Sequence, residues 1–404
     1  MSSPGPHGVQ PSRLQTTDLI GPVLLFVGGF LLAAAIALPT VFVDGLRTIP
    51  LSTDVTTTAL STGTGDAESA QVFDRCSLAT ASARVVGADL VRQQRFVAVQ
   101  PSDADRVTLQ AGTSIQADSL RVDDDREVDP QAPRPGSDTE PPAGQAQCTD
   151  PTVGAVRDRI TLDRTSALPD LGPTSGQPGS SEIQYDSNAA PIRVPDRTGY
   201  TYLLPFGVSD TEHTWFDVIT RRTVPLRPAG TTTVHGRDAT RFVADVPDTD
   251  LHQISGDAQS APPTIITRPA SWFGVPGVDP ARELTATLHH SGRTELAVDT
   301  ATGTILDEQI TIEQSYRFID TSLPDQRLTA LSASFGYDDP TQARMSDRAT
   351  SLNTPIAIWG RVVPILAALA GLAAIAAGLM LITRGWPPRR PRRPAAHADP
   401  TPSS

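Results

Sequence analysis

Two long uncharged apolar runs lie near opposite ends of the chain, at residues 19–43 and 362–383. Each is long enough to match the roughly 20 residues that a helix needs to cross a bilayer. The sequence therefore predicts two transmembrane helices, assigned to residues 19–43 and 355–383. The polar segment between them, residues 44–354, is then held at a membrane by both of its ends.

Arginines directly after the second run indicate the orientation of the chain in the membrane, because arginine near a membrane end is retained on the cytoplasmic side. They are Arg384, Arg389, Arg390, Arg392 and Arg393. Residues 384–404 are thus expected to form a basic, disordered cytoplasmic tail, and an even number of spans places residues 1–18 on the same side. Residues 44–354 then lie outside the cytoplasm, anchored to the inner (plasma) membrane.

A cleaved signal peptide is the main alternative for the first apolar run. Residues 35–37, Ala-Ile-Ala, resemble a small-residue cleavage site. A secretory apolar region is only about 7–15 residues long, however. Apolar character here continues through Val43, which favours an uncleaved anchor.

The charge and the cysteines place further limits on the segment between the runs. The formal net charge of the whole chain is −12. An acidic surface of this kind repels nucleic acid at long range. Cys76 and Cys148 are the two cysteines, both in this segment. An oxidising compartment permits a disulfide between them, with two unpaired thiols as the alternative.

Period-two alternation rich in Thr, Val, Ile and aromatic residues recurs along residues 44–354 and predicts half-buried β-strands. The predicted strands are residues 95–100, 106–109, 119–122, 159–162, 214–220, 231–234, 240–246, 283–288, 294–298 and 304–318. Turn signals stand at residues 235–238, 290–292 and 300–303. The fold class is therefore a mostly β ectodomain, a sandwich or a partly open barrel, flanked by two transmembrane helices.

A few segments of the ectodomain depart from the strand pattern. Residues 82–94 and 339–352 are expected to form short helices, the first with Ser82 placed to cap it. Residues 123–147, 169–181 and 252–280 are rich in Pro, Gly, Ser or acidic residues and are expected to be flexible.

No sequence pattern for catalysis or cofactor binding is present: the chain has no G-x-S-x-G, H-E-x-x-H, P-loop or dinucleotide-binding motif. His289 and His290 are adjacent, and neighbouring residues on a strand point to opposite faces, so they cannot chelate one metal ion. Residues 123–125 are three aspartates without the spacing of a calcium loop. The sequence predicts a non-enzymatic protein with no cofactor and no metal site.

Aromatic side chains are concentrated in part of the ectodomain. They include Tyr200, Tyr202, Phe206, Trp215 and Phe216, followed by Trp272 and Phe273. One interpretation is the core of a β-sheet. The other is an apolar groove that shelters an acyl chain, which burial stabilises by about 0.8 kcal/mol per CH₂.

Small residues recur every four positions in both apolar runs, and such ladders allow close helix contact in lipid. They are Gly29, Ala33 and Ala37 in the first run and Ala370, Ala374 and Gly378 in the second. Chance is the alternative in a chain so rich in alanine. Neither run has an ionisable residue in its core, which argues against a pump or a primary transporter.

Several segments together resemble the actinobacterial family labelled porin PorA, over nearly the whole chain. They are residues 47–51 (Arg-Thr-Ile-Pro-Leu), 92–97, 159–164, 202–206, 215–217, 222–226 and 298–305, together with both apolar runs. The resemblance implies a two-span envelope protein of mycolic-acid-bearing bacteria. It also implies periplasmic handling of trehalose mycolates beside a large lipid exporter in the inner membrane.

These observations lead to one predicted function and two alternatives. The prediction is a protein of envelope biogenesis that binds or hands off a mycolate-type glycolipid. One alternative is a scaffold that binds partner proteins without a lipid cavity, and the other is a porin-like channel. A pore-forming barrel needs an apolar outer band, whereas these strands carry Arg, Asp and Glu on their outer faces.

Overall fold

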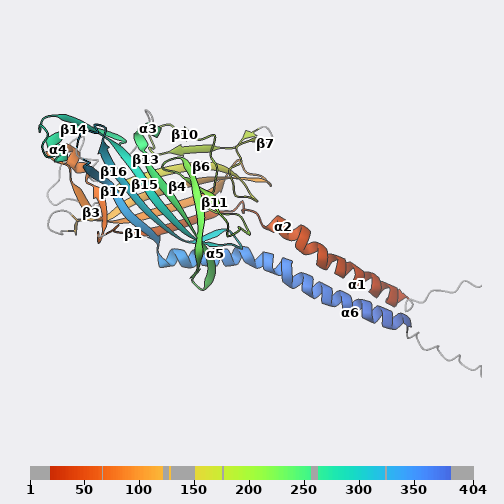
Figure 1. Ribbon diagram of the computed structural model, residues 1–404. Helices are drawn as coiled ribbons and strands as arrows, with labels where there is room; N and C mark the ends of the chain where they lie inside the picture. The colour runs from red at the N-terminus through yellow and green to blue at the C-terminus, as the bar shows by residue number, and fades with distance from the viewer. Residues whose placement is uncertain are drawn as a thin grey trace, which may run out of the picture. The chain divides into compact units, whose positions relative to one another are not determined.

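The computed structural model describes residues 19–65, 67–121, 127–128, 151–174, 177–255, 263–323 and 325–383. The chain divides into two compact units. One unit is formed by the residues up to Leu46 together with those from Pro355 onward, and the other, the ectodomain, by residues 47–354. In the described part of the chain, the first unit is helical and the second is mainly strands (Figure 1).

The helical unit contains two helices that are long and apolar enough to cross a membrane. Helix α1 (Ile20–Ala37) continues through a π-helical segment, η2 (Leu38–Phe42), into α2 (Val43–Leu46). Helix α6 (Val363–Thr383) is preceded by a second π-helical segment, η5 (Ile358–Val362). The rings of Phe42 and Trp359 meet edge to face with centroids 5.3 Å apart, which joins the two segments.

Glycines form the contact between α1 and α6. Gly21 and Gly28 are buried against Gly378 and Gly371, so the two helices are antiparallel. A Cβ atom added to Gly28 would lie 2.7 Å from the carbonyl oxygen of Gly371, and one added to Gly371 would lie 2.9 Å from that of Gly28. Because no side chain fits there, the backbones approach closely, as small residues permit in lipid.

The predicted four-residue ladder is wrong for α1. A Cβ atom on Gly29 would meet nothing within 4 Å, and Ala33 and Ala37 are exposed. In α6, Ala370 is exposed and Ala374 half-buried, so only Gly378 of the predicted set lies at the glycine contact. A step of seven residues returns to within about 20° of the same helix face, whereas a step of four drifts by about 40°. The glycine contact follows the seven-residue step.

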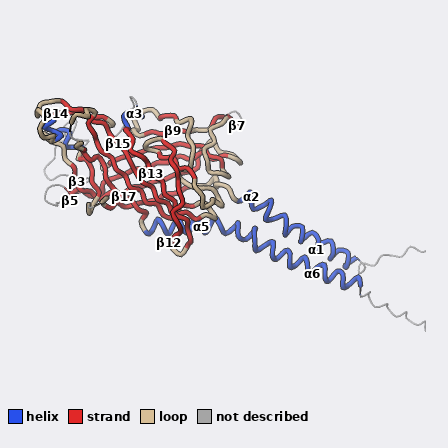
Figure 2. The backbone as a smooth tube through the Cα atoms, in the orientation of Figure 1, coloured by secondary structure: helices blue, strands red, loops and turns tan. Residues whose placement is uncertain are grey.

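The ectodomain is built on one large antiparallel sheet (Figure 2). Its main strands, in spatial order, are β10 (Ile192–Arg193), β9 (Ser181–Gln184), β6 (Thr152–Asp163), β4 (Arg106–Arg121), β3 (Val85–Val99), β1 (Asp54–Thr62), β17 (Arg327–Tyr337), β16 (Thr304–Phe318), β15 (Glu283–Asp299), β13 (Arg237–Asp250), β12 (Arg222–Val234) and β11 (His213–Asp217). Strands β2 (Ala70–Phe73), β5 (Glu127–Val128) and β14 (Ile265–Pro269) pair beside this path, and β7 (Pro173–Thr174) pairs with β8 (Gln177–Pro178).

The remaining ectodomain elements are short helices and one longer helix. They are the 3₁₀ helix η3 (Arg75–Ala79), α3 (Leu251–Ser255), α4 (Ala270–Phe273) and α5 (Asp339–Ala357). The last of these passes from the ectodomain into η5 without a break in the helix. The predicted helix at residues 339–352 is therefore confirmed.

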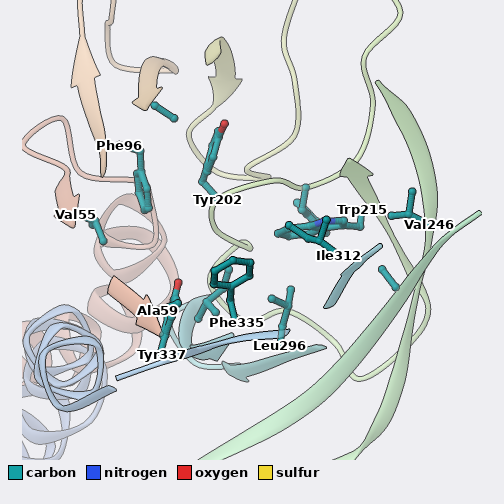
Figure 3. Packing of buried hydrophobic residues seen from close by; sticks show 14 of the residues in the cluster. Val55, Ala59, Phe96, Tyr202, Trp215, Val246, Leu296, Ile312, Phe335 and Tyr337 are labelled. Carbon is teal, nitrogen blue, oxygen red and sulfur yellow. The ribbon is translucent and has the colours of Figure 1, made fainter. Parts of the chain in front are cut away.

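The sheet curls around its own core. Residues from strands near its two ends, including Ile160 of β6 and Trp215 of β11, belong to one buried apolar cluster. Figure 3 shows Phe96, Tyr202, Trp215, Ile312 and Phe335 turned towards this shared interior. The mostly β fold is thus confirmed, in the form of a single curled sheet, that is, a partly open barrel.

Local turn chemistry explains the hairpins. The β12–β13 turn consists of His235 and Gly236, both with positive φ (46° and 74°), the geometry of a tight two-residue hairpin. The β15–β16 turn ends at Gly303, whose φ is 69°. A Cβ atom there would lie 1.9 Å from the carbonyl oxygen of Leu204, so only glycine fits. The predicted turn at 300–303 is confirmed. The turn predicted at 235–238 is present but shorter, since Arg237 and Asp238 already belong to β13.

Three other local predictions are corrected by the structure. Residues 82–94 do not form a helix, because most of them belong to β3, where Val86, Ala88 and Leu90 alternate as buried residues. The turn predicted at residues 290–292 is continuous strand within β15. The described part of residues 252–280 contains most of α3 together with β14 and α4, and residues 256–262 lie outside the described residues. Of residues 123–147, all except 127–128 lie outside the described residues.

The outer face of the sheet carries cross-strand ion pairs. Arg95 of β3 binds Asp54 of β1 at 2.8 Å, and both side chains are more than half exposed. Arg293 of β15 binds Asp245 of β13 at 2.9 Å, also in the open. Charged pairs of this kind suit contact with water rather than with hydrocarbon.

Candidate functional site

A cavity of about 180 Å³ lies inside the curled sheet. Its wall comes from strands along most of the sheet order, from β6, β4 and β3 to β17, β16, β15, β13 and β11. Apolar lining residues include Ile115, Tyr202, Trp215, Phe216 and Ile312. A concave, mostly apolar cavity with a few placed polar groups is the usual form of a small-ligand site.

Strand register explains why polar residues also face this cavity. On β3, Leu90, Arg92, Gln94 and Phe96 are all buried, so every second residue points inward. On β4, Ile115 stands opposite Arg92, and Thr113 stands opposite Gln94. The inward face of β3 therefore places a guanidinium and an amide where a closed core would carry apolar side chains.

Arg92 forms an ion pair with Glu308 of β16 inside the barrel. Its Nη1 donates to Glu308 Oε2 at 2.9 Å, and the two side chains are 9% and 6% exposed. Gln94 Nε2 donates to Thr113 Oγ1 at 3.1 Å. Burial raises the pKa of Tyr337 well above its usual value, and the negative charge of Glu308 adds to this effect.

A second polar pair lines the cavity on β15 and β16. His290 is 3% exposed, and its Nδ1 lies 3.1 Å from Gln314 Nε2. An amide nitrogen only donates, so Nδ1 accepts and the neutral ring carries its proton on Nε2. Burial lowers the pKa of His290, and the carboxylates of Asp217 and Asp248 only partly oppose that effect.

The free energy of unfolding is expected to fall as the pH drops below about 6.5, because the unfolded histidine then takes up a proton that folded His290 does not bind. His290→Gln should remove this part of the pH dependence while keeping a polar, neutral side chain. The measurement is urea unfolding of the full chain at a series of pH values between neutral and mildly acidic. His213→Gln serves as the control, and an unchanged pH slope in His290→Gln contradicts the prediction.

Side chains, rather than a continuous strand ladder, join the two ends of the curled sheet. Asp158 of β6 accepts two hydrogen bonds from Arg197, each 2.7 Å long, and one of 2.6 Å from the Tyr202 hydroxyl. The guanidinium of Arg197 also lies 4.2 Å from the ring centroid of Phe216 on β11. We call Asp158, Arg197, Tyr202 and Phe216 the closing cluster.

Electrostatics and backbone contacts reinforce the closing cluster. The side chains of Arg197 and Asp158 are 0% and 1% exposed. Burial lowers the pKa of Arg197, but the charge and hydrogen bonds of Asp158 outweigh this effect, so that its pKa is raised. The backbone of Tyr200 forms hydrogen bonds with the backbone of Thr214 and Phe216 on β11. The Tyr185 hydroxyl donates to the Val218 carbonyl at 2.6 Å.

The aromatic residues singled out from the sequence fall into four places. Tyr202, Trp215 and Phe216 line the cavity. Tyr200 is buried in the same apolar cluster without lining the cavity, and Phe206 lines a smaller pocket of about 30 Å³ that it shares with Tyr202. Trp272 and Phe273 belong to a separate apolar cluster around α4, where Trp272 Nε1 donates to the Ser77 carbonyl at 2.9 Å.

Cys76 lies in η3 and is half-buried. Cys148 is outside the described residues, so the disulfide stays a prediction. Within the described ranges, no group of three or more His, Cys, Asp or Glu side chains could hold a metal ion.

The polar cavity residues were not identified as site residues from the sequence. A signal for them exists: Arg92 and Gln94 share the alternation of Leu90 and Phe96, and Glu308 and Gln314 share that of Ile310 and Ile312. Polar residues on the inward face of a strand mark a barrel whose interior is not a closed apolar core.

The fold and the cavity define a class of protein: two apolar helices attached to a curled antiparallel sheet with a pocket inside it. The family model described as porin PorA matches residues 20–380. A protein named porin PorA from Corynebacterium amycolatum is 23% identical over 414 residues, covering 90% of this chain and 98% of that relative. Another of the same name, from Corynebacterium resistens, is 22% identical over 422 residues, covering 90% and 96%.

The chain therefore belongs to the porin PorA family, which confirms the resemblance carried by its sequence segments. Together with the family, the two apolar helices indicate a membrane protein.

Proposed function

We propose that the ectodomain is a non-enzymatic binding protein for an amphipathic lipid, which it holds in the cavity of the curled sheet. The observation that carries this proposal is the composition of the cavity wall. Trp215, Phe216 and Ile312 offer apolar surface, and Arg92 and Glu308 add polar groups. An apolar chain and a polar headgroup would both find partners in one cavity.

The sequence supplies the setting of this proposal. The arginines of residues 384–404 favour an inner-membrane protein with both termini in the cytoplasm and the ectodomain outside. A mycolate-type glycolipid is the ligand that the resemblance suggests, and a lipid exporter in the same membrane is the proposed partner. The tether would keep the binding domain next to the source of its ligand.

Filling the cavity tests the proposal. Gly154 of β6 lines the cavity and stands opposite Ile115, so its Cβ position points inward, and a Cβ atom there meets nothing within 4 Å. Gly154→Phe should place a ring in the cavity and weaken binding of the apolar probe N-phenyl-1-naphthylamine by at least about tenfold, since a buried ring displaces the ligand's apolar contacts. Fluorescence of the probe, after subtraction of the signal from empty nanodiscs, measures binding by the full chain in nanodiscs.

The matched control is Gly112→Phe on the neighbouring strand β4. A Cβ atom on Gly112 also meets nothing within 4 Å, but this residue is exposed and lies outside the cavity wall. Equal binding by both variants and the unaltered chain would overturn the proposal. Mass spectrometry of lipid that co-purifies with the full chain identifies the class of ligand. Bare protein that captures an exporter would instead indicate the scaffold function.

A channel is the second candidate, and the family description as a porin favours it. Conductance steps from the purified full chain in a planar bilayer would support it. Gly154→Phe should reduce the conductance if ions pass through the cavity, and Gly112→Phe should leave it unchanged. Single-channel recording thus separates the channel from the binding protein.

A further inference from the structure

The ion pair inside the cavity has polar atoms that the protein itself does not use. Within the described part of the chain, the Nη1–Oε2 bond is the only hydrogen bond of the Arg92 and Glu308 side chains. Both residues are more than nine-tenths buried and both line the cavity. None of the remaining polar atoms of the two side chains is both inaccessible and without a hydrogen-bond partner. These atoms therefore keep accessible surface, and they face the cavity.

A buried ion pair of this kind destabilises the fold unless its remaining polar atoms find further hydrogen-bond partners. Taking two charges out of water carries a desolvation penalty that one mutual hydrogen bond does not repay. A guanidinium has five N–H donors and a carboxylate has two acceptor oxygens. The pair thus presents unused donors and an unused acceptor side by side at the wall of an otherwise mostly apolar cavity.

The charge balance of this wall limits the chemistry of a ligand. Arg92 and Glu308 cancel one another. Arg293, which also lines the cavity, is bound to Asp245 at 2.9 Å and to Glu295 at 2.8 Å. Asp217, which also lines the cavity, accepts bonds of 2.6 Å from the Thr220 amide and hydroxyl. An anion that approached Arg92 would also approach the Glu308 carboxylate in a low-dielectric setting, where like charges repel strongly. A hydroxyl group, in contrast, accepts from Arg92 and donates to Glu308 without adding charge.

We propose that Arg92 and Glu308 bind the polar headgroup of the ligand and select an uncharged, hydroxylated headgroup over a carboxylate. Gln94 extends this site by one inward position along β3, with its amide bound to Thr113. The inference rests on the proposed lipid binding and assigns its specificity to one ion pair.

A chain-matched pair of short ligands tests the selection. Octyl glucoside and octanoate share an eight-carbon chain and differ in the headgroup. Each is used below its micelle-forming concentration to displace N-phenyl-1-naphthylamine from the full chain in nanodiscs, with empty nanodiscs as background. The unaltered protein is expected to bind octyl glucoside at least about tenfold more tightly than octanoate. A sugar hydroxyl can bond to both Arg92 and Glu308, whereas a carboxylate leaves the buried acceptor of Glu308 unsatisfied.

Glu308→Gln is the decisive variant, because it leaves the Arg92 cation without its counter-charge. Octanoate is expected to gain at least about tenfold in affinity relative to octyl glucoside, as a carboxylate now completes the pair. Asp54→Asn, which removes the carboxylate of the exposed Arg95–Asp54 pair on the outer face, should leave the ratio unchanged.

A charge-neutral double variant covers the case in which Glu308→Gln fails to fold. Arg92→Gln with Glu308→Gln removes both charges at similar volume, and it should bind the probe while losing the preference for octyl glucoside. A ratio that does not change in either variant would overturn the headgroup site but leave the cavity proposal standing. Failure of the unaltered protein to bind the probe would instead overturn the proposed lipid binding.

Discussion

Asp158→Asn is expected to lower the free energy of unfolding of the ectodomain by about 3–5 kcal/mol, because it leaves a buried charge without its partner. Arg197 has no exposed side-chain surface and donates two of its hydrogen bonds to this one carboxylate. The same carboxylate holds the Tyr202 hydroxyl. One substitution thus weakens the closing cluster at its centre, where β6 is joined to the segment that covers β11.

Urea unfolding of the full chain in nanodiscs, followed by near-ultraviolet circular dichroism, measures this effect. Asp54→Asn is the matched control, since its pair with Arg95 is solvent-exposed and contributes little. A combined Asp158→Leu and Arg197→Met variant should recover much of the loss, because two apolar side chains leave no buried charge. A loss in Asp158→Asn no larger than that in the control would contradict the role assigned to the closing cluster.

Gly28→Leu is expected to separate α1 from α6. A Cβ atom there would approach the Ile375 amide nitrogen to 3.0 Å and the Gly371 carbonyl oxygen to 2.7 Å, and backbone atoms cannot move aside as a flexible side chain can. The close backbone packing that favours the pair in lipid is then lost. Pulsed electron paramagnetic resonance between spin labels at Leu19 and Thr383 should show a narrow distance distribution become broad.

Gly29→Leu is the control, one residue away on the same helix, and it should leave the distribution narrow because a Cβ atom there meets nothing within 4 Å. The labels require Cys76 and Cys148 to be replaced by serine in all samples. The glycine contact would be refuted if both leucine variants gave the same distribution as the unaltered sequence.

The sequence was informative where local chemistry and burial agree. The hairpin of β15 and β16 was predicted from alternation and from a turn that ends in glycine, and the helix at residues 339–352 was predicted from its pattern. Both are present. In these places the side chains that alternate inward, such as Leu296 and Val298, are apolar and buried.

Two of the predictions failed where the inward face of a strand is polar. Arg92 and Gln94 interrupt the apolar alternation of β3 at the end of residues 82–94, the segment that was expected to be a helix. His290 and Gly292 interrupt β15 in the same way and resembled a turn. All four line the cavity. The departures from a simple strand pattern therefore mark the candidate site, as expected when local rules are broken for function.

The contact between α1 and α6 was mispredicted for a different reason. Many small residues occur in both apolar runs, and composition alone does not say which of them face the partner helix. The pairing of Gly28 with Gly371 depends on the rotation of both helices, which only the folded contact reveals.

The position of β1 in the sheet has a consequence for biosynthesis. This strand, the first of the ectodomain, lies between β3 and β17, and Leu60 pairs with Gly336 near the end of the domain. Contacts between residues so far apart in the sequence form slowly, because the entropy of closing a long loop is lost before the contacts contribute any stabilising energy. The sheet cannot be completed until almost the whole domain has left the ribosome. A nascent chain halted before β17 should expose an unpaired strand edge, the kind of surface that aggregates or recruits chaperones.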